Sequence, residues 1–324
     1  MVSVCCTAYN HEKYIRKCLD GFIMQQTDFK YEVIINDDAS TDRTANVIRE
    51  YEEKYPEIIK PIYQTENQYS RGIPIIRSIM LPKVLGKYIA FCEGDDYWTD
   101  PNKLQKQFDA LEGHPECAIC LHKVKMVSED ETKICGYKPE INIEPGVISS
   151  DYFASIVVNT RTLGFMQFQL SSYFCRTSLE RESVREGKDF YEQFDVGDLP
   201  LLLYSSTQGD VYYLNEVMSN YRVNSIGCWN SRNSETDKLL EHYYTEMNGI
   251  KAFDELTAHV YKKDIEIRLN LYELKIALIQ NKLTPRLYKK YKQVMQFYPF
   301  RSRVKMLFAA YCPALLELYY KITG

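Results

Sequence analysis

The sequence lacks the marks of several large classes of protein. It has no signal-peptide pattern at its start and no Asn-x-Ser/Thr glycan acceptor, and its ten cysteines show no paired spacing. Its 40 lysines and arginines do not outnumber its 44 aspartates and glutamates, and a net charge of -4 excludes the broad positive field of a nucleic-acid-binding protein. We therefore expect a cytoplasmic protein with free thiols that binds no nucleic acid.

Two common phosphate-binding loops and a clear membrane span are also missing. Neither G-x-G-x-x-G nor G-x-x-x-x-G-K-[ST] occurs among the 14 glycines. The apolar stretch 306–320 is broken by Pro313 and Glu317, which excludes a helix with the roughly 20 apolar residues that a bilayer requires. The remaining composition, 45% hydrophobic and 26% charged, is that of an ordinary globular protein with one large domain and an appendage, or two domains.

Short apolar runs and amphipathic stretches alternate along the first hundred residues. The runs 2–9, 31–36, 58–63 and 87–92 are typical of buried strands. Apolar residues at helical spacing predict helices from residue 12, after a cap at Ser40 or Thr41, and over 74–85. Such alternation forms right-handed βαβ units, so we expect an α/β fold with a mostly parallel central sheet flanked by helices.

Acidic residues follow two of these strands at the point where each strand ends. Asp37 and Asp38 follow the second strand, and the segment 93–96 (Glu-Gly-Asp-Asp) follows the fourth. Ligands bind beyond the carboxyl ends of parallel strands, and clustered carboxylates repel one another unless a cation or a donor-rich ligand joins them. A hard divalent cation held by one or two carboxylates and by diphosphate oxygens meets this need, which predicts a Mg²⁺ or Mn²⁺ cofactor.

Three motifs in this region resemble those of the inverting family 2 glycosyltransferases, which have the GT-A fold. They are Val-Ser-Val-x-x-Thr-x-Tyr-Asn from residue 2, Asp-Asp-Ala-Ser-Thr-Asp-x-Thr from residue 37, and Glu-Gly-Asp-Asp-Tyr-Trp-Thr-Asp-Pro-x-Lys-Leu from residue 93. The resemblance covers residues 2–110 closely and 150–229 more loosely. It implies transfer of a sugar from a nucleoside-diphosphate donor, expected to be a UDP sugar, to a glycan or lipid-linked glycan during synthesis of a bacterial polysaccharide such as a capsule.

The resemblance also implies roles for the motif residues. Thr7, Ala8 and Tyr9 would line the nucleobase pocket, where Asp38, together with Asp37, would hydrogen-bond the base. In the third motif, Asp95 would be the metal ligand of the family's D-x-D pattern. The first acid of that pattern is here Glu93, a contact to ribose or to metal, and Gly94 and Asp96 complete this part of the donor site.

An inverting reaction also needs a base that takes the proton of the acceptor hydroxyl. The segment 196–201 resembles the family's acidic segment, and it makes Asp198 the candidate catalytic base. An aspartate before an apolar helix, with Pro200 two residues on, is also a good helix N-cap, and both roles can hold at once. Asp195 is the alternative base.

A late Tyr-Arg segment completes the resemblance. Arg222 would neutralise the diphosphate, for which its planar, two-pronged guanidinium is suited. Many relatives carry His where this chain has Asn224, so a second contact there does not follow. Trp229 would stack on a sugar ring or serve packing alone.

The pattern of apolar and charged residues changes near residue 235 to a long helical periodicity. We expect a catalytic domain over 1–234, with a nucleotide-sugar half (about 1–110) and an acceptor half (about 111–234), and a helical region over 235–324. The polar stretch 128–145 is expected to be a loop or an excursion of the chain over the site. The basic and aromatic segment 301–320 is either an interfacial helix at the inner face of the membrane or a helix that packs on the catalytic domain or in a homodimer.

Two other functions are compatible with acids on such a sheet. A nucleotidyltransferase would normally carry a glycine-rich loop after the first strand, whereas this chain has Thr-Ala-Tyr-Asn over 7–10. A non-catalytic carbohydrate-binding or scaffold protein would be expected to lose the metal ligand or the base, whereas Asp95 and Asp198 are both present.

Overall fold

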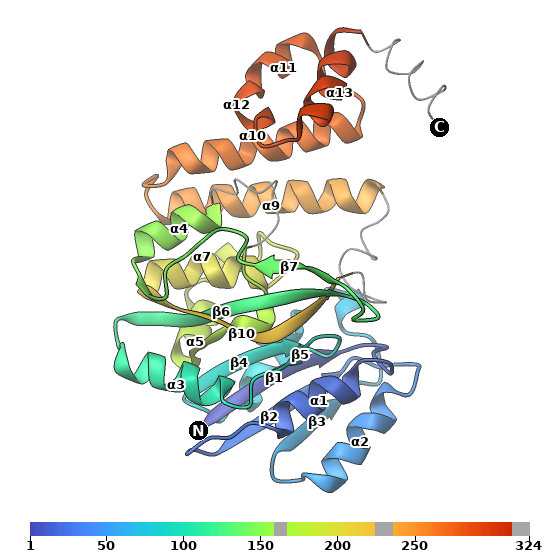
Figure 1. Cartoon of the computed structure of the whole chain (residues 1–324), viewed down its shortest axis with the longest axis vertical. Coiled ribbons are helices and arrows are strands. Elements are labelled where there is room, and N and C mark those ends of the chain that lie inside the picture. The colour runs from blue at the N-terminus through green and yellow to red at the C-terminus, as the bar shows by residue number, and fades with distance from the viewer. Residues whose placement is uncertain (159–166, 224–235, 313–324) are drawn as a thin grey trace. The chain divides into compact units, whose positions relative to one another are not determined.

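The computed structural model describes residues 1–158, 167–223 and 236–312 (Figure 1). They form two compact units. The first unit comprises Met1–Phe153, Gln167–Tyr191 and Val196–Asn233, and the second comprises Ala154–Met166, Glu192–Asp195 and Ser234–Gly324. Asn224, Trp229 and the residues after Cys312 lie outside the described residues.

The first unit begins with four parallel strands in the order β3-β2-β1-β4. These are β1 (Val2–Ala8), β2 (Tyr31–Asp37), β3 (Ile59–Tyr63) and β4 (Tyr88–Glu93). Helices α1 (Ile15–Ile23) and α2 (Thr44–Lys54) connect β1 to β2 and β2 to β3. Strands β1, β2 and β4 are buried on both faces, as their near-continuous apolar sequences predicted, whereas the edge strand β3 buries only Ile59. The carboxyl ends of the four strands meet at one edge of the sheet.

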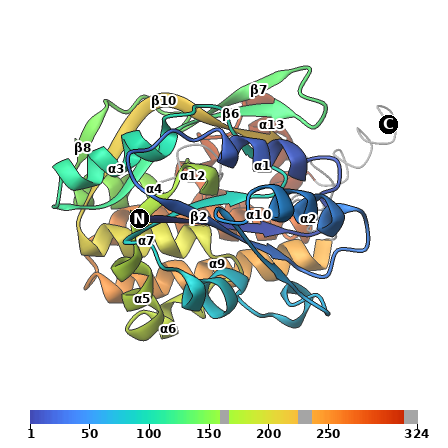
Figure 2. The same ribbon diagram turned by 90° about the horizontal axis from the view of Figure 1, so that it is seen from below.

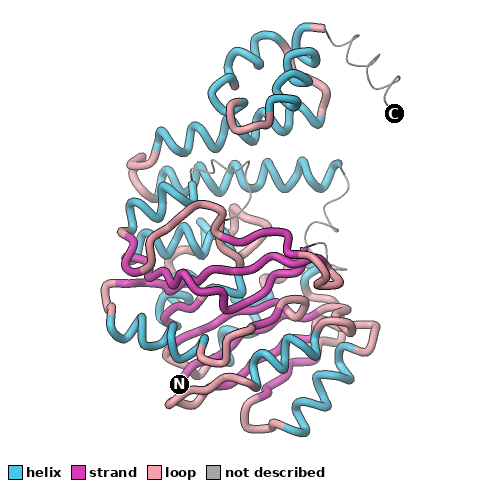
Figure 3. The backbone as a smooth tube through the Cα atoms, viewed as in Figure 1, coloured by secondary structure: helices cyan, strands magenta, loops and turns pink. Residues whose placement is uncertain are grey.

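The sheet then continues as a mixed one. Beyond β4 the order is β9-β6-β10-β5, in which β9 is antiparallel to both β4 and β6, β6 and β10 are parallel, and β5 is antiparallel to β10. The members are β5 (Tyr97–Trp98), β6 (Cys117–Ser128), β7 (Ile134–Lys138), β8 (Gly146–Ile148), β9 (Phe174–Arg176) and β10 (Asp210–Val223). The parallel order that the sequence predicted thus holds for the first half and gives way to mixed pairing in the second. Figure 3 shows the strands, in magenta, stacked beside one another with helices around them.

Helices cover both faces of this sheet (Figure 2). The helices are α1, α3 (Lys103–Gly113), α5 (Thr177–Arg185), α6 (Lys188–Tyr191) and α7 (Asp198–Gln208). Helix α1 buries Cys18, Leu19 and Phe22, and the Phe22 ring meets the edge of Trp98 at 4.7 Å between ring centres. Gly21 is required at this contact, because a Cβ there would lie 2.9 Å from the backbone oxygen of Trp98.

Three local expectations were wrong. The helix expected over 74–85 is a π-turn (Ile76–Met80) followed by a 3₁₀ turn (Leu81–Lys83), since Pro82 cannot donate the next helical hydrogen bond. Neither Ser40 nor Thr41 caps α2, which begins at Thr44 with its amide bound to Asp42 at 2.9 Å. The polar stretch 128–145 is not a plain loop, because it contains β7 in a hairpin with β6.

The second unit is helical. It contains the C-terminal part of α4 (Ser150–Val158), then α9 (Thr236–Leu256), α10 (Lys262–Ile279), α11 (Pro285–Lys290), α12 (Lys292–Met295) and α13 (Phe300–Tyr311). Leu274, Tyr291 and Met306 belong to its apolar core. Within residues 1–158, 167–223 and 236–312, none of the helices combines the length and the apolar character that crossing a bilayer demands.

Candidate active site

The register of β1 brings the predicted donor residues to one sheet edge. Thr7 is paired with Glu93 on β4, and Ala8 is paired with Asp37 on β2. Tyr9 follows directly and is half-buried. The Gly94 amide donates to the Thr7 carbonyl at 2.8 Å, and a side chain at Gly94 would crowd the His11 ring and Ala8. Glycine is therefore needed at position 94, where the turn that follows β4 packs against the end of β1.

Asp37 and Asp38 have different surroundings, although both are buried. The two carboxylate oxygens of Asp38 accept the backbone amides of Gln68 at 2.7 Å and Tyr69 at 3.0 Å. Asp38 thus holds the chain that follows β3 close to the sheet edge. Burial raises the pKa of Asp37, an effect opposed by hydrogen bonds from Ser40, and its Oδ1 has no partner among the described residues.

The Glu93–Asp96 turn gathers three carboxylates of very different exposure. Glu93 is exposed, whereas Asp95 and Asp96 are buried. Burial raises the pKa of Asp96, and the charges of Asp95 and Glu93 raise it further, while a hydrogen bond from the Arg222 amide at 3.0 Å opposes the shift. The mutual repulsion of these carboxylates is the electrostatic condition that a cation relieves.

The oxygen ligands of this turn fit Mg²⁺ or Mn²⁺ bound largely through a substrate. Among the described residues, no three His, Cys, Asp or Glu side chains form a ready-made metal cluster. A cation that keeps phosphate and water oxygens in its shell needs only one or two carboxylates from the protein, and Asp95 and Glu93 supply that number.

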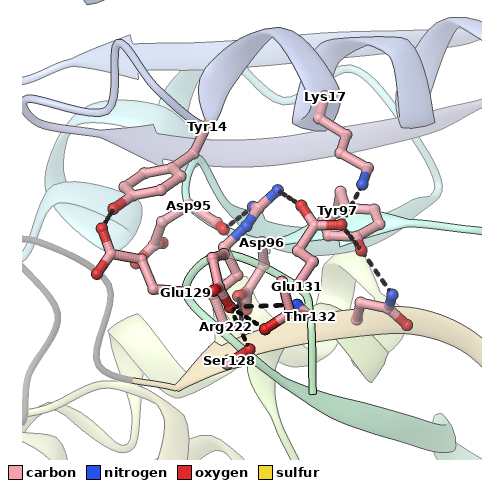
Figure 4. A network of polar contacts seen from close by, with 12 residues as sticks. Tyr14, Lys17, Asp95, Asp96, Tyr97, Ser128, Glu129, Glu131, Thr132 and Arg222 are labelled. Atoms are coloured by element: carbon pink, nitrogen blue, oxygen red, sulfur yellow. Dashed lines mark hydrogen bonds and ion pairs between the residues drawn. The ribbon is translucent and has the colours of Figure 1, made fainter. Parts of the chain in front are cut away.

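Arg222 lies at the centre of the polar network drawn in Figure 4. Its side chain is 2% exposed, its Nη2 donates to Glu131 at 2.6 Å, and its Nη1 donates to the Asp95 carbonyl. The guanidinium also lies over the Tyr97 ring, 4.5 Å from the ring centre, and its Nε has no partner among the described residues. The pairing of β10 with β5 brings Arg222 to this place, since Asn220 is opposite Tyr97.

The turn between β6 and β7 supplies an acidic group that sequence reasoning missed. Glu131 accepts hydrogen bonds from Arg222, from the Tyr97 hydroxyl at 2.7 Å and from Lys17. These donors overcome partial burial and lower the pKa of Glu131 to about 2. Glu129 in the same turn accepts from the Tyr14 hydroxyl at 2.5 Å, and the turn lines a depression of about 740 Å³. The run Ser-Glu-Asp-Glu-Thr at 128–132 was the available signal.

Asp198 is the first residue of α7 and is partly buried. Its Oδ1 accepts the amide of the adjacent Leu199 at 2.9 Å. The N-cap role predicted for Asp198 was wrong, because Gly197 is the N-cap of α7 and no side chain makes a cap hydrogen bond there. Burial raises the pKa of the nearby Tyr173 hydroxyl, and the charges of Asp198 and Glu93 raise it further. Both carboxylates therefore lie close to one buried tyrosine. Asp195 differs, because it belongs to the second unit and binds His242.

Residues 3–153 match the family model described as Glycosyl transferase family 2. The chain belongs to this glycosyltransferase family. Similar curated proteins include the uncharacterised protein Rv1520 of Mycobacterium tuberculosis, 34% identical over 255 residues that make up 78% of this chain and 66% of that protein. Another is a poly(ribitol-phosphate) beta-glucosyltransferase of Bacillus spizizenii, 35% identical over 97 residues, 30% of this chain and 15% of that enzyme. The chain therefore spans less than two thirds of the length of these relatives.

The fold of this glycosyltransferase is also that of solved GT-A structures. The crystal structure of S. aureus TarS 1-349 in complex with UDP matches with a TM-score of 0.56 and 18% identity, over 90% of this chain and 91% of that one. The same TarS fragment in complex with UDP-GlcNAc matches with a TM-score of 0.55 and 19% identity, over 95% of this chain and 86% of that one. The fold class and the family inferred from the three sequence motifs are thereby confirmed.

Proposed function

We propose that the protein is an inverting glycosyltransferase that moves a sugar from a UDP sugar to a hydroxyl group of a growing glycan or lipid-linked glycan. The observation that carries this proposal is the gathering of Glu93, Asp95, Asp96 and Arg222 beside the β1 end. TarS, which has the same fold, was crystallised with UDP and with UDP-GlcNAc. A relative named for its action on poly(ribitol phosphate) supports a bacterial surface polymer as the acceptor.

The donor's base lies beside Thr7, Ala8 and Tyr9. The unpartnered Oδ1 of Asp37 accepts a hydrogen bond from the base, because an orphaned buried acceptor is costly until a ligand satisfies it. Asp38 acts differently from the role that the resemblance implied for it. Its oxygens already accept two backbone amides, so it orders the wall of the base pocket.

The diphosphate lies between the Glu93–Asp96 turn and Arg222. Asp95, with Glu93, would hold Mg²⁺ or Mn²⁺, and such a cation neutralises the charge that develops on the leaving diphosphate. Arg222 binds diphosphate oxygens once Glu131 releases its guanidinium, because a phosphate and a carboxylate compete for the same two-pronged donor.

Asp198 is the base of the transfer. Its carboxylate takes the proton of the acceptor hydroxyl while the hydroxyl oxygen attacks the anomeric carbon from the side opposite the diphosphate. The bond to the diphosphate oxygen breaks as the new bond forms, so the configuration inverts. The amino-terminal end of α7 favours a negative charge at Asp198.

A calorimetric titration of UDP with and without Mn²⁺ tests the metal and donor assignments together. We expect Mn²⁺ to tighten binding of UDP to the wild-type protein and Asp95→Ala to abolish that gain. Asp109→Ala, which removes an exposed carboxylate on α3, is the matched control and should bind as the wild type does. An undiminished Mn²⁺ effect in Asp95→Ala would overturn the metal assignment.

We further propose that α13 brings the enzyme to the cytoplasmic face of a membrane that holds the acceptor. Phe300 is 71% exposed, and Phe308 and Tyr311 are also exposed, while Met306 and Ala310 pack into the core of the second unit. Arginine and lysine at 301, 303 and 305 give the same helix the positive charge that anionic lipids attract. A homodimer through this face is the alternative outcome.

A further inference from the structure

The carboxylate of Glu131 is held by donors from three separate elements of the first unit. Lys17 belongs to α1, Tyr97 to β5 and Arg222 to β10. Nη2 of Arg222 donates to Oε1 of Glu131 at 2.6 Å, and the Tyr97 hydroxyl donates to Oε2 at 2.7 Å. Nζ of Lys17 donates to the same Oε2, and Figure 4 shows the three donors gathered at the carboxylate. Three elements therefore direct their donors at one pair of oxygen atoms.

These donors suit a phosphate group better than a carboxylate. Lys17 and Arg222 are both cations, and both lie over the Tyr97 ring, 4.2 Å and 4.5 Å from its centre. Glu131 brings one negative charge and two oxygens to them. A terminal phosphate brings up to two negative charges and three acceptor oxygens, and guanidinium groups bind it through paired hydrogen bonds.

Arg222 cannot give up Glu131 unless another anion takes its place. The Arg222 side chain is 2% exposed, so an unpaired guanidinium would be a buried charge without compensation. Its Nε and the Oδ1 of nearby Asn220 have no partner among the described residues, which leaves Nε available to a further oxygen. Burial opposes ionisation of Glu131, yet its donors lower its pKa to about 2, so protonation does not release Arg222 near neutral pH. Exchange with a second anion does.

The turn that carries Glu131 is built so that it can be displaced. Asp130 accepts hydrogen bonds from the Ser128 hydroxyl at 2.6 Å and from the Thr132 amide at 3.1 Å, so the turn holds its own shape. Glu129, Asp130 and Thr132 are exposed. Glu131 thus reaches from a turn at the surface to a buried arginine, and the turn can withdraw without breaking a strand.

We propose that Lys17 and Tyr97 form a phosphate site together with Arg222, which Glu131 occupies in the free protein and a phosphate of the donor occupies after displacing it. This inference rests on the proposed function and extends it, since Lys17 lies outside the three sequence motifs and Tyr97 has no role in the third. Until the donor arrives, the carboxylate keeps the three donor groups in place. Groups that are already ordered cost less entropy when the ligand binds.

A double-mutant cycle separates a residue that binds phosphate from one that only holds Glu131. In the Glu131→Gln background the competing charge is gone, and Lys17 has no carboxylate to hold. We expect Lys17→Gln in this background to weaken binding of UDP about 10-fold, measured by calorimetry in EDTA so that no cation contributes. Tyr97→Phe removes one hydroxyl without a change of charge and should weaken UDP binding by about three- to tenfold. Unchanged affinity in both double variants would overturn the proposal.

Arg16→Gln in the same background is the matched control. Arg16 is the neighbouring cation on α1 and pairs with Glu50, so its loss removes the same charge from the helix and should leave the affinity for UDP unchanged. Uridine, followed by an NMR titration, should bind to the Lys17 variant as it binds to the parent, because it carries no phosphate. An equal loss for uridine and UDP would overturn the assignment, since the base pocket would then be the part affected.

Pyrophosphate distinguishes failure of this site from failure of the proposed function. It should bind to Glu131→Gln and should lose affinity with Lys17→Gln as UDP does. A protein that binds pyrophosphate in this way but binds UDP no more tightly keeps the phosphate site and overturns the nucleotide donor of the proposed function. A protein that binds UDP tightly, and equally in the Lys17 and Tyr97 variants, keeps the donor and overturns this site.

Discussion

The guanidinium of Arg222 has a carboxylate partner that a donor diphosphate would have to replace. Glu131→Gln removes the competing charge, so we expect UDP to bind several-fold more tightly, a gain on the order of 1 kcal/mol. The folded state should lose about 1–3 kcal/mol, because buried Arg222 gives up a charged hydrogen bond. Calorimetry and urea unfolding measure the two effects.

Glu129→Gln is the matched control for this prediction, since Glu129 accepts from Tyr14 in the same turn. It should leave UDP binding unchanged. Weaker binding of UDP to Glu131→Gln would mean that the turn supports the donor site instead of competing with the donor.

Asp198 has a local hydrogen bond as well as the proposed role of base, and one atom separates the two. Asp198→Asn keeps the oxygen that accepts the Leu199 amide and removes the basicity. We expect turnover to fall about 10²–10⁴-fold while donor KM and the melting temperature stay the same. Near-normal steady-state turnover in this variant would leave Asp198 with a structural role alone.

Glu180 on α5 makes the stability depend on pH. It is 3% exposed, and burial raises its pKa to about 7 from an ordinary value of 4.5, although Arg77 opposes the shift. The folded state therefore binds more protons than the unfolded state between these values. Stability that is present below about pH 4.5 is lost as the pH rises through about 7, by about 2–3 kcal/mol.

Glu180→Gln should remove most of this loss, so that the unfolding free energies at pH 5 and pH 8 become nearly equal. Urea unfolding at the two pH values measures it. Glu186→Gln, an exposed neighbour at the end of the same helix, should keep the wild-type dependence. If Glu180→Gln also keeps the wild-type pH dependence of the unfolding free energy, another titrating group is its cause.

Local sequence predicted some of these residues and could not predict others. Asp37 and Glu93 come at the ends of buried strands, so βαβ topology predicts that they gather at one edge of the sheet. The strand register confirms this, because both are paired with residues at the end of β1. Glu131 lies in the turn of the β6–β7 hairpin, and it reaches Arg222 only because β6 also pairs with β10, a pairing that joins residues about ninety positions apart. No local pattern encodes such a contact.

Single elements show the same division between local and distant causes. Helix α1 follows from its apolar spacing, whereas the π-turn at Ile76–Met80 and the start of α2 depend on Pro82 and on Asp42. Helix α13 was predicted as a basic and aromatic segment. Its division into a buried face with Met306 and an exposed face with Phe308 needed the tertiary structure.

The exposed face of α13 predicts binding to anionic vesicles. We expect the full chain to float with phosphatidylglycerol vesicles at low salt and to float less in the double variant Phe300→Ser/Phe308→Ser. Tyr244→Ser removes an exposed aromatic residue from α9 and is the matched control. A full chain that stays in the soluble fraction contradicts the membrane proposal. A wild-type dimer that becomes a monomer in the double variant would favour the homodimer instead.

At the scale of the whole molecule, the sequence motifs that predicted the family and the fold lie in the first unit. The family 2 match covers residues 3–153, where the βαβ pattern and the acidic motifs lie. The second unit has helical periodicity but no motif, so its sequence predicted helices without predicting that Glu192–Asp195 would join them. That segment is short and far from α9 in sequence, and its attachment is revealed by the packing of Phe194 on Gly249 and by the hydrogen bond between His242 and Asp195.

The configuration of the released sugar tests the central claim most directly. Slow hydrolysis of UDP sugars, with water as the acceptor, can be followed by proton NMR in the presence of Mn²⁺ before the anomers equilibrate. The account predicts that an α-linked donor first releases the β anomer together with UDP, and that Asp198→Asn stops this release. Initial release of the α anomer, or of a sugar phosphate together with UMP, would contradict it.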